Sequence, residues 1–145
     1  MITDLKSQLT RDEGRRLHAY QDTEGFWTIG IGHRIYGLTD EQCAVLEWTD
    51  ADCDAQYEKD AHHSYTHMLS LAPWAVLLDD VRRAALQNMW FNMGDKVLEF
   101  YNMIDCLRKQ DWSGAAAQML NSKWAGQVGA RASRLAEQIR VGTWQ

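Results

Sequence analysis

Two acidic residues and a hydroxyl residue near the start of the chain have the types and spacing that acid–base chemistry needs. Glu13 is followed after eight residues by Asp22, and Asp22 after five residues by Thr28. Cleavage of a glycosidic bond needs a proton donor for the leaving oxygen and an opposing carboxylate that activates water or attacks the sugar. A glutamate at a helix end that faces an aspartate on a sheet supplies both. Taken singly, each has an ordinary alternative, a surface helix end for Glu13 and a turn residue for Asp22.

The elements predicted around these residues would position such a pair. Apolar residues recur at helical spacing within residues 1–12, and Gly14 offers a stop signal, which predicts a short first helix. From His18 to Tyr36, aromatic and β-branched residues mix with turn formers, which predicts a small antiparallel sheet. Glu13 would then end the helix, and Asp22 would occupy a tight turn between two strands.

The rest of the chain is predicted to be helical. Thr39 and Thr49 each precede an acidic first turn, the usual start signal of a helix. From Trp74 onward apolar residues recur at helical intervals, which predicts a bundle of short helices. We therefore expect a predominantly helical α+β fold and a single domain over residues 1–145. Its parts are an N-terminal lobe (about 13–49), a linking helix (about 50–69) and a C-terminal helical lobe (about 70–145), with the first helix (1–12) packed on that lobe.

Motifs along most of the chain follow a known pattern. Around the three residues these are Asp12-Glu13-Gly14, Tyr20–Gly25 and Trp27–His33, and further on Val81–Leu86, Asn88–Gly94, Ser122–Trp124, Arg131–Arg134 and Gly142–Trp144. In this order and spacing they resemble the T-even phage lysozymes, glycoside hydrolase family twenty-four. The resemblance implies a two-lobed lysozyme fold and hydrolysis of the β-1,4 bond between N-acetylmuramic acid and N-acetylglucosamine in bacterial peptidoglycan.

The resemblance also assigns roles to residues. It implies that Glu13 donates the proton and that Asp22 and Thr28 hold the hydrolytic water, so that the bond is cleaved with inversion. Other residues would line the substrate cleft or support the site. The cleft residues implied are Arg34, Phe91, Asn92, Met103 and Gln118, and the supporting residues are Arg131, as partner of Glu13, and His33 with Asp60, as an ion pair.

Composition limits the other classes of function. The chain carries a net charge of −5, which argues against general nucleic-acid binding, because Lys and Arg supply most of the non-specific affinity for phosphate. The tryptophans are expected mainly in the core rather than on a sugar-stacking platform. We expect neither a metal nor a cofactor. Three cysteines without metal-type spacing (Cys43, Cys53, Cys106) are expected as reduced thiols, and His62, His63 and His67 as a solvated helix face.

The biological setting is inferred from targeting signals. The start of the sequence lacks the features of a secretory signal, and no run of about 18 apolar residues follows. We therefore expect a monomeric endolysin without stable membrane insertion, made in the host cytoplasm and reaching the wall after a holin opens the membrane. Two alternatives stay open: a bacterial muramidase used as an antagonistic effector, and a non-catalytic wall-binding module on a lysozyme scaffold, since fold alone does not establish activity.

Overall fold

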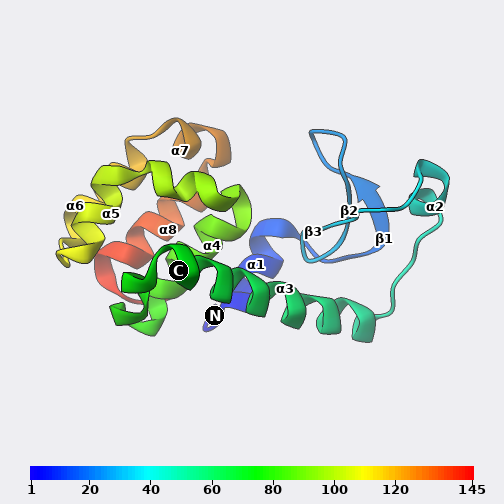
Figure 1. Cartoon of the computed structure of the whole chain (residues 1–145), viewed down its shortest axis with the longest axis horizontal. Helices are drawn as coiled ribbons and strands as arrows, with labels where there is room; N and C mark the ends of the chain where they lie inside the picture. Colours follow the sequence, from blue (N-terminus) through cyan, green and yellow to red (C-terminus); the bar gives the residue numbers. More distant parts are fainter. The chain divides into compact units, whose positions relative to one another are not determined.

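The computed structural model describes residues 1–145, which divide into two compact units. The smaller unit comprises residues 4–63, and the larger comprises residues 1–3 together with residues 64–145. Helix α3 (Asp50–Leu71) contributes residues to both units. The chain has the predominantly helical α+β class that the sequence predicts, with one small sheet (Figure 1).

Helix α1 (Leu5–Glu13) begins the smaller unit, and local sequence sets both of its ends. The Asp4 carboxylate accepts a hydrogen bond from the backbone N–H of Ser7 at 2.8 Å and so caps the start of the helix. Gly14 ends it with a φ of 80°, which glycine adopts without strain, and donates its N–H to the Thr10 carbonyl at 3.0 Å. Glu13 is therefore the last helical residue, as the sequence suggests.

The sheet has three antiparallel strands in the order β1-β2-β3. These are β1 (Arg16–Gln21), β2 (Trp27–Gly30) and β3 (His33–Arg34). Tyr20 pairs with Thr28, and Thr28 pairs with Arg34, so these three residues form one row across the sheet. The small antiparallel sheet predicted between residues 18 and 36 is confirmed.

Two threonines start the next helices, as predicted. The Thr39 side chain caps α2 (Asp40–Ala44) by accepting from the backbone N–H of Gln42. At the start of α3 the Thr49 hydroxyl accepts from the Asp52 N–H at 3.1 Å, and the Asp52 carboxylate accepts from the Thr49 N–H at 2.9 Å. The bond from the Thr49 backbone lowers the pKa of Asp52. Helix α3 then continues to Leu71, close to the predicted end near residue 69.

Helix α1 and the residue that follows Gly14 are tied to the first half of α3 by ion pairs. Lys6 Nζ lies 3.0 Å from Asp54 Oδ1, and Arg15 reaches both Asp54 Oδ1, at 2.8 Å, and Asp50 Oδ1, at 2.9 Å. Hydrogen bonds from Arg15 and then from Lys6 lower the pKa of Asp54. Helix α1 and the sheet belong to the same compact unit, and the packing of residues 1–12 on the helical lobe stays a prediction.

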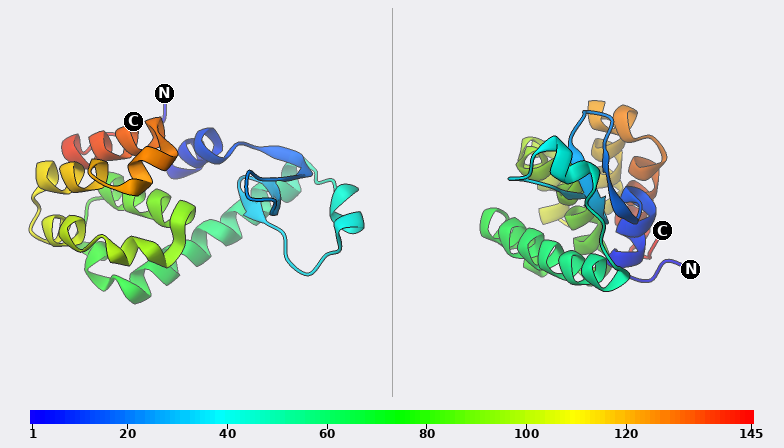
Figure 2. Two further views of the ribbon diagram at one scale, coloured as in Figure 1. Left: turned by 90° about the horizontal axis from the view of Figure 1, so that it is seen from above. Right: turned by 90° about the vertical axis from the view of Figure 1, so that its right-hand side faces the viewer.

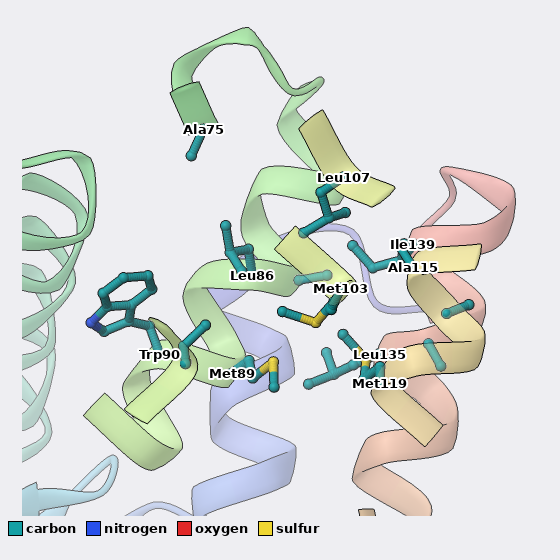
Figure 3. Close-up of a cluster of buried hydrophobic side chains, with 14 of the residues drawn as sticks. Ala75, Leu86, Met89, Trp90, Met103, Leu107, Ala115, Met119, Leu135 and Ile139 are labelled. Atoms are coloured by element: carbon teal, nitrogen blue, oxygen red, sulfur yellow. The ribbon is translucent and has the colours of Figure 1, made fainter. Parts of the chain in front are cut away.

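The larger unit is a bundle of helices (Figure 2) that encloses an apolar core. Its elements are η1 (Pro73–Leu77), α4 (Asp80–Met93), η2 (Gly94–Glu99), α5 (Tyr101–Arg108), α6 (Trp112–Leu120), α7 (Lys123–Val128) and α8 (Ala130–Val141). Buried side chains of α4 pack with those of α5, α6 and α8 (Figure 3). Trp90 and Trp124 belong to this core, in agreement with the role predicted for most of the tryptophans. None of the helices combines the length and the apolar character that crossing a membrane requires.

Candidate active site

Glu13 is positioned by the end of α1 and by the turn between β2 and β3. Gly32, in that turn, has a φ of 65° and approaches the glutamate so closely that a Cβ atom added to it would lie 3.0 Å from Glu13 Cβ and Cγ. The same Cβ would lie 3.2 Å from Glu13 Oε2. The carboxyl group of Glu13 is therefore held beside the backbone of the sheet, and only a glycine leaves room for it.

Asp22 is fixed by backbone hydrogen bonds within the turn between β1 and β2. Its Oδ1 accepts from the backbone N–H groups of Glu24, at 2.9 Å, and Phe26, at 2.8 Å. The Asp22 N–H in turn donates to the Phe26 carbonyl at 2.9 Å. These bonds occupy one carboxylate oxygen, so Oδ2 is left to accept a hydrogen bond from outside the protein.

Thr28 presents a hydroxyl oxygen from β2. The side chain is 6% exposed, and its Oγ1 donates to the Phe26 carbonyl at 3.1 Å. A hydroxyl that has given its proton to a carbonyl keeps lone pairs that accept a hydrogen bond. Thr28 and Asp22 therefore both offer acceptor oxygens, and both are bonded to Phe26 at the same turn.

Tyr20, which the sequence did not single out, lies within electrostatic reach of both carboxylates. Burial raises the pKa of the Tyr20 phenol; the charge of Arg16 opposes this, and the negative charges of Glu13 and Asp22 add to it. The Tyr20 phenol therefore senses the charge of both carboxylates. Tyr20 also pairs with Thr28 across the sheet, so these two side chains project to one face.

His33 and Asp60 form the pair that the resemblance implied. His33 Nδ1 lies 2.7 Å from Asp60 Oδ2, with both side chains largely buried, and Gln56 donates to the other oxygen, Asp60 Oδ1, at 2.8 Å. The His33 ring also packs against Trp48 at a centroid distance of 5.6 Å. Because His33 lies on β3 and Asp60 on α3, the pair attaches the sheet to the helix.

Arg34 lies beside the same turn. Its guanidinium carbon sits 3.8 Å from the centroid of the Phe26 ring, in a cation–π contact. Arg34 pairs across the sheet with Thr28, and directly opposite residues of an antiparallel pair project to the same face. The arginine is thus placed next to Thr28 and, through Phe26, next to Asp22.

The smaller unit therefore brings together a carboxyl group and two acceptor oxygens. Such a set can protonate a leaving oxygen and deprotonate a water molecule, which is the chemistry of glycoside hydrolysis. Comparisons with known proteins point to the same reaction. The family model described as phage lysozyme matches residues 10–138. The chain belongs to the phage lysozyme family.

Individual relatives agree with this assignment. The chain is 33% identical over 165 residues to the probable T4-type lysozyme 1 of Dictyostelium discoideum, covering 99% of the chain and 97% of that protein. With the probable T4-type lysozyme 2 of the same organism the identity is 32%, with the same coverage. The pre-baseplate central spike protein Gp5 of Enterobacteria phage T4 is 30% identical over 95% of the chain, which spans 28% of that longer protein. The chain is thus a lysozyme, a muramidase-type glycoside hydrolase with a lysozyme-like α+β fold.

The remaining residues assigned by the resemblance to this family lie in the larger unit. Phe91 is partly buried at the end of α4. Asn92 is exposed, and its Oδ1 accepts a hydrogen bond from Trp124 Nε1 at 2.8 Å. Arg131 is 7% exposed, and its Nε donates to Asn88 Oδ1 at 3.0 Å. The sequence did not single out Asn88, whose only signal was its place in the motif before Phe91. The pairing of Arg131 with Glu13 stays a prediction.

Met103 and Gln118 meet at a pocket of about 310 Å³ in the larger unit. Met103 is 1% exposed and belongs to the apolar core (Figure 3), and it also lines the pocket. Gln118 is partly exposed and adds an amide to the lining. The two residues therefore share one pocket, and their role in binding substrate stays a prediction.

The histidines of α3 were predicted to form a solvated face. His67 Nε2 lies 2.8 Å from Asp95 Oδ1, an oxygen that also accepts from Trp90 Nε1 at 3.1 Å. The hydrogen bond from His67 lowers the pKa of Asp95. No group of three or more His, Cys, Asp or Glu side chains is arranged to hold a metal ion.

Proposed function

We propose that the enzyme hydrolyses the β-1,4 bond between N-acetylmuramic acid and N-acetylglucosamine of peptidoglycan, with Glu13 as general acid. The observation that carries this proposal is that one small sheet holds Asp22 and Thr28 at its β1–β2 turn and Glu13 beside its β2–β3 turn, in a member of the phage lysozyme family. Glu13 protonates the glycosidic oxygen as the bond breaks. Water supplies the hydroxyl group of the new reducing end, and its proton passes to Asp22.

The hydrogen bonds of Asp22 and Thr28 favour inversion over a covalent intermediate. Backbone N–H groups occupy Asp22 Oδ1, which leaves Oδ2 as an acceptor, and the Thr28 hydroxyl donates to the Phe26 carbonyl, which leaves its lone pairs. A water molecule that donates one proton to each of these oxygens directs its own lone pair away from them, toward the anomeric carbon. Single displacement by this water converts the β-linkage into an α-anomeric product.

Three variants test the assigned roles. Glu13→Gln should lower kcat by at least about 100-fold, because an amide does not donate the proton. Asp22→Asn should lose most of the activity, and Thr28→Ala should lose about 10- to 100-fold through poorer placement of the water. Glu24→Gln is the matched control, because it removes an exposed carboxylate from the same turn and should retain wild-type activity. Rates are measured from the clearing of purified peptidoglycan suspensions.

The stereochemistry is read from fresh digestion products by NMR. The α-anomer should appear first and then mutarotate. The β-anomer appearing first would contradict the water-mediated mechanism, and near-normal clearing by Glu13→Gln would contradict the assignment of the acid. A wild-type protein that binds peptidoglycan without clearing it would instead support a non-catalytic wall-binding module.

The biological role that fits best is that of a phage endolysin. Its support is the family itself, which is that of the phage lysozymes. In this role the protein accumulates as a monomer in the host cytoplasm and reaches the wall once a holin has permeabilised the membrane. Expression in a bacterial host with and without a co-expressed holin tests this, because lysis should require both proteins. Lysis without the holin would contradict the proposed route.

A further inference from the structure

Arg34 differs from several other arginines of this chain in what it contacts. Arg15, Arg82, Arg83 and Arg140 each form an ion pair with an aspartate or glutamate. Arg34 forms no ion pair with a carboxylate and instead lies over the Phe26 ring, with 3.8 Å between the guanidinium carbon and the ring centroid. Its charge is therefore not neutralised within the protein.

The position of Arg34 relates it to the reacting groups. Thr28 and Arg34 are directly opposite in the sheet, so their side chains project to one face. The neighbouring pair, Ile29 and His33, projects to the opposite face, where His33 binds Asp60 of α3. Arg34 thus shares the face of the proposed water site rather than the face that packs on α3.

Phe26 provides the ring on which the guanidinium group lies. Its backbone N–H donates to Asp22 Oδ1, and its carbonyl accepts from the Thr28 hydroxyl, so the Phe26 backbone is attached to both residues. The ring is 45% exposed, which leaves the stacked pair accessible from solvent. Stacking uses a face of the guanidinium group and leaves the N–H groups along its edge, a planar fork that matches the two oxygens of a carboxylate.

We propose that Arg34, held against Phe26, binds a carboxylate of the peptidoglycan strand next to the Asp22–Thr28 water site and selects carboxylate-bearing glycans over neutral ones. This inference rests on the proposed function, since it names the substrate class of the same site. Peptidoglycan offers such a carboxylate in two places. One is the lactyl group of a muramic acid without a stem peptide, and the other is a carboxylate within the stem peptide.

The experiment compares soluble glycan strands in two matched pairs. Peptide-free strands, which carry lactyl carboxylates, are assayed before and after amide capping with methylamine and a carbodiimide. Peptide-bearing strands are treated in the same way. Wild-type enzyme, Arg34→Gln and Arg34→Lys are compared with Arg140→Gln, a control that removes the same charge from an arginine paired with Glu137 in the larger unit.

Capping should lower the kcat/KM of the wild type by about tenfold for whichever strands, peptide-free or peptide-bearing, carry the carboxylate that Arg34 binds. This is the effect expected for loss of one charge-assisted contact. Arg34→Gln should remove this difference mainly through KM and leave cleavage of capped strands unchanged. Arg34→Lys should restore part of it, because a lysine keeps the charge and loses the fork. Arg140→Gln should behave as wild type.

Two results would overturn the inference. One is an unchanged capping effect in Arg34→Gln with both pairs of strands. The other is an equal fall in kcat on capped and uncapped strands, which would indicate that Arg34 only supports Phe26. Failure of the proposed function is distinguishable from both, because the wild type would then cleave none of the strands.

Discussion

Replacing Gly32 by alanine should reduce activity by much more than the accompanying loss of stability explains. Gly32 has a φ of 65°, in the left-handed region, where a residue with a side chain costs about 1–2 kcal/mol. For a chain of this size, that corresponds to a fall in Tm of roughly 2–8 °C. The added Cβ would also lie 3.0 Å from Glu13 Cβ and Cγ, closer than carbon atoms normally pack, so the glutamate has to move.

The loss of activity follows from that movement. Displacement of a catalytic group by about 1 Å costs about 100-fold in rate, so even a smaller shift of Glu13 should reduce kcat by about tenfold or more. Gly37→Ala is the matched control, because Gly37 has a φ of 79° and nothing within 4 Å of an added Cβ. It should lose similar stability and keep its activity.

The assay combines thermal melts with initial rates of peptidoglycan clearing, measured well below the melting temperature of every variant. The expected pattern is a similar fall in Tm for both alanine variants and a fall in kcat for Gly32→Ala alone. Equal activity of the two variants, with both fully folded, would refute the argument that Gly32 makes room for the proton donor.

Two further predictions concern the ion pairs that α3 forms with Arg15 and Lys6 and with His33. Because hydrogen bonds from Arg15 and Lys6 lower the pKa of Asp54, its contribution to stability is present above the ordinary aspartate pKa of about 4 and is lost as pH falls through the lower, folded value. Asp54→Asn should therefore lower Tm at neutral pH, and the difference from wild type should shrink in acid below about pH 4; a difference that persists there would contradict the ion-pair explanation. His33→Asn should lower the free energy of unfolding by about 1–3 kcal/mol, since it removes a charge-assisted hydrogen bond to Asp60 and the packing on Trp48. Chemical denaturation measures this, and an unchanged midpoint would show that the pair does not contribute.

Most of the candidate site could be predicted because its signals are local in sequence. The end of α1 at Gly14, the turn at Asp22 and the caps at Thr39 and Thr49 each depend on a few adjacent residues, and the structure has all four. The stack of Arg34 on Phe26 was predictable only in part, since it depends on the register of β2 with β3.

Contacts between distant residues could not be predicted in the same way. The Asn88 side chain meets Arg131 across 43 positions of sequence, and Arg15 meets Asp54 across 39. Nothing local distinguishes these residues from other polar groups on helices, because their partners are determined only when the helices pack. The Lys6–Asp54 ion pair has the same origin, since the apolar pattern of residues 1–12 does not encode a partner on α3.

Contacts with helix α3 fix the segment that carries the proposed acid, Glu13, and the sheet that carries the proposed water-binding residues. A unit of about 60 residues buries a small core, so packing alone leaves little stability to hold a site rigid. Arg15, two residues after Glu13, binds Asp50 and Asp54, and His33, on the strand that pairs with Thr28, binds Asp60. The segment after Glu13 and the strand beside Thr28 therefore both bind helix α3, at positions about two to three turns apart. The spacing between the proton donor and the proposed water then depends on that helix and on the close approach of Gly32, rather than on the rest of the chain.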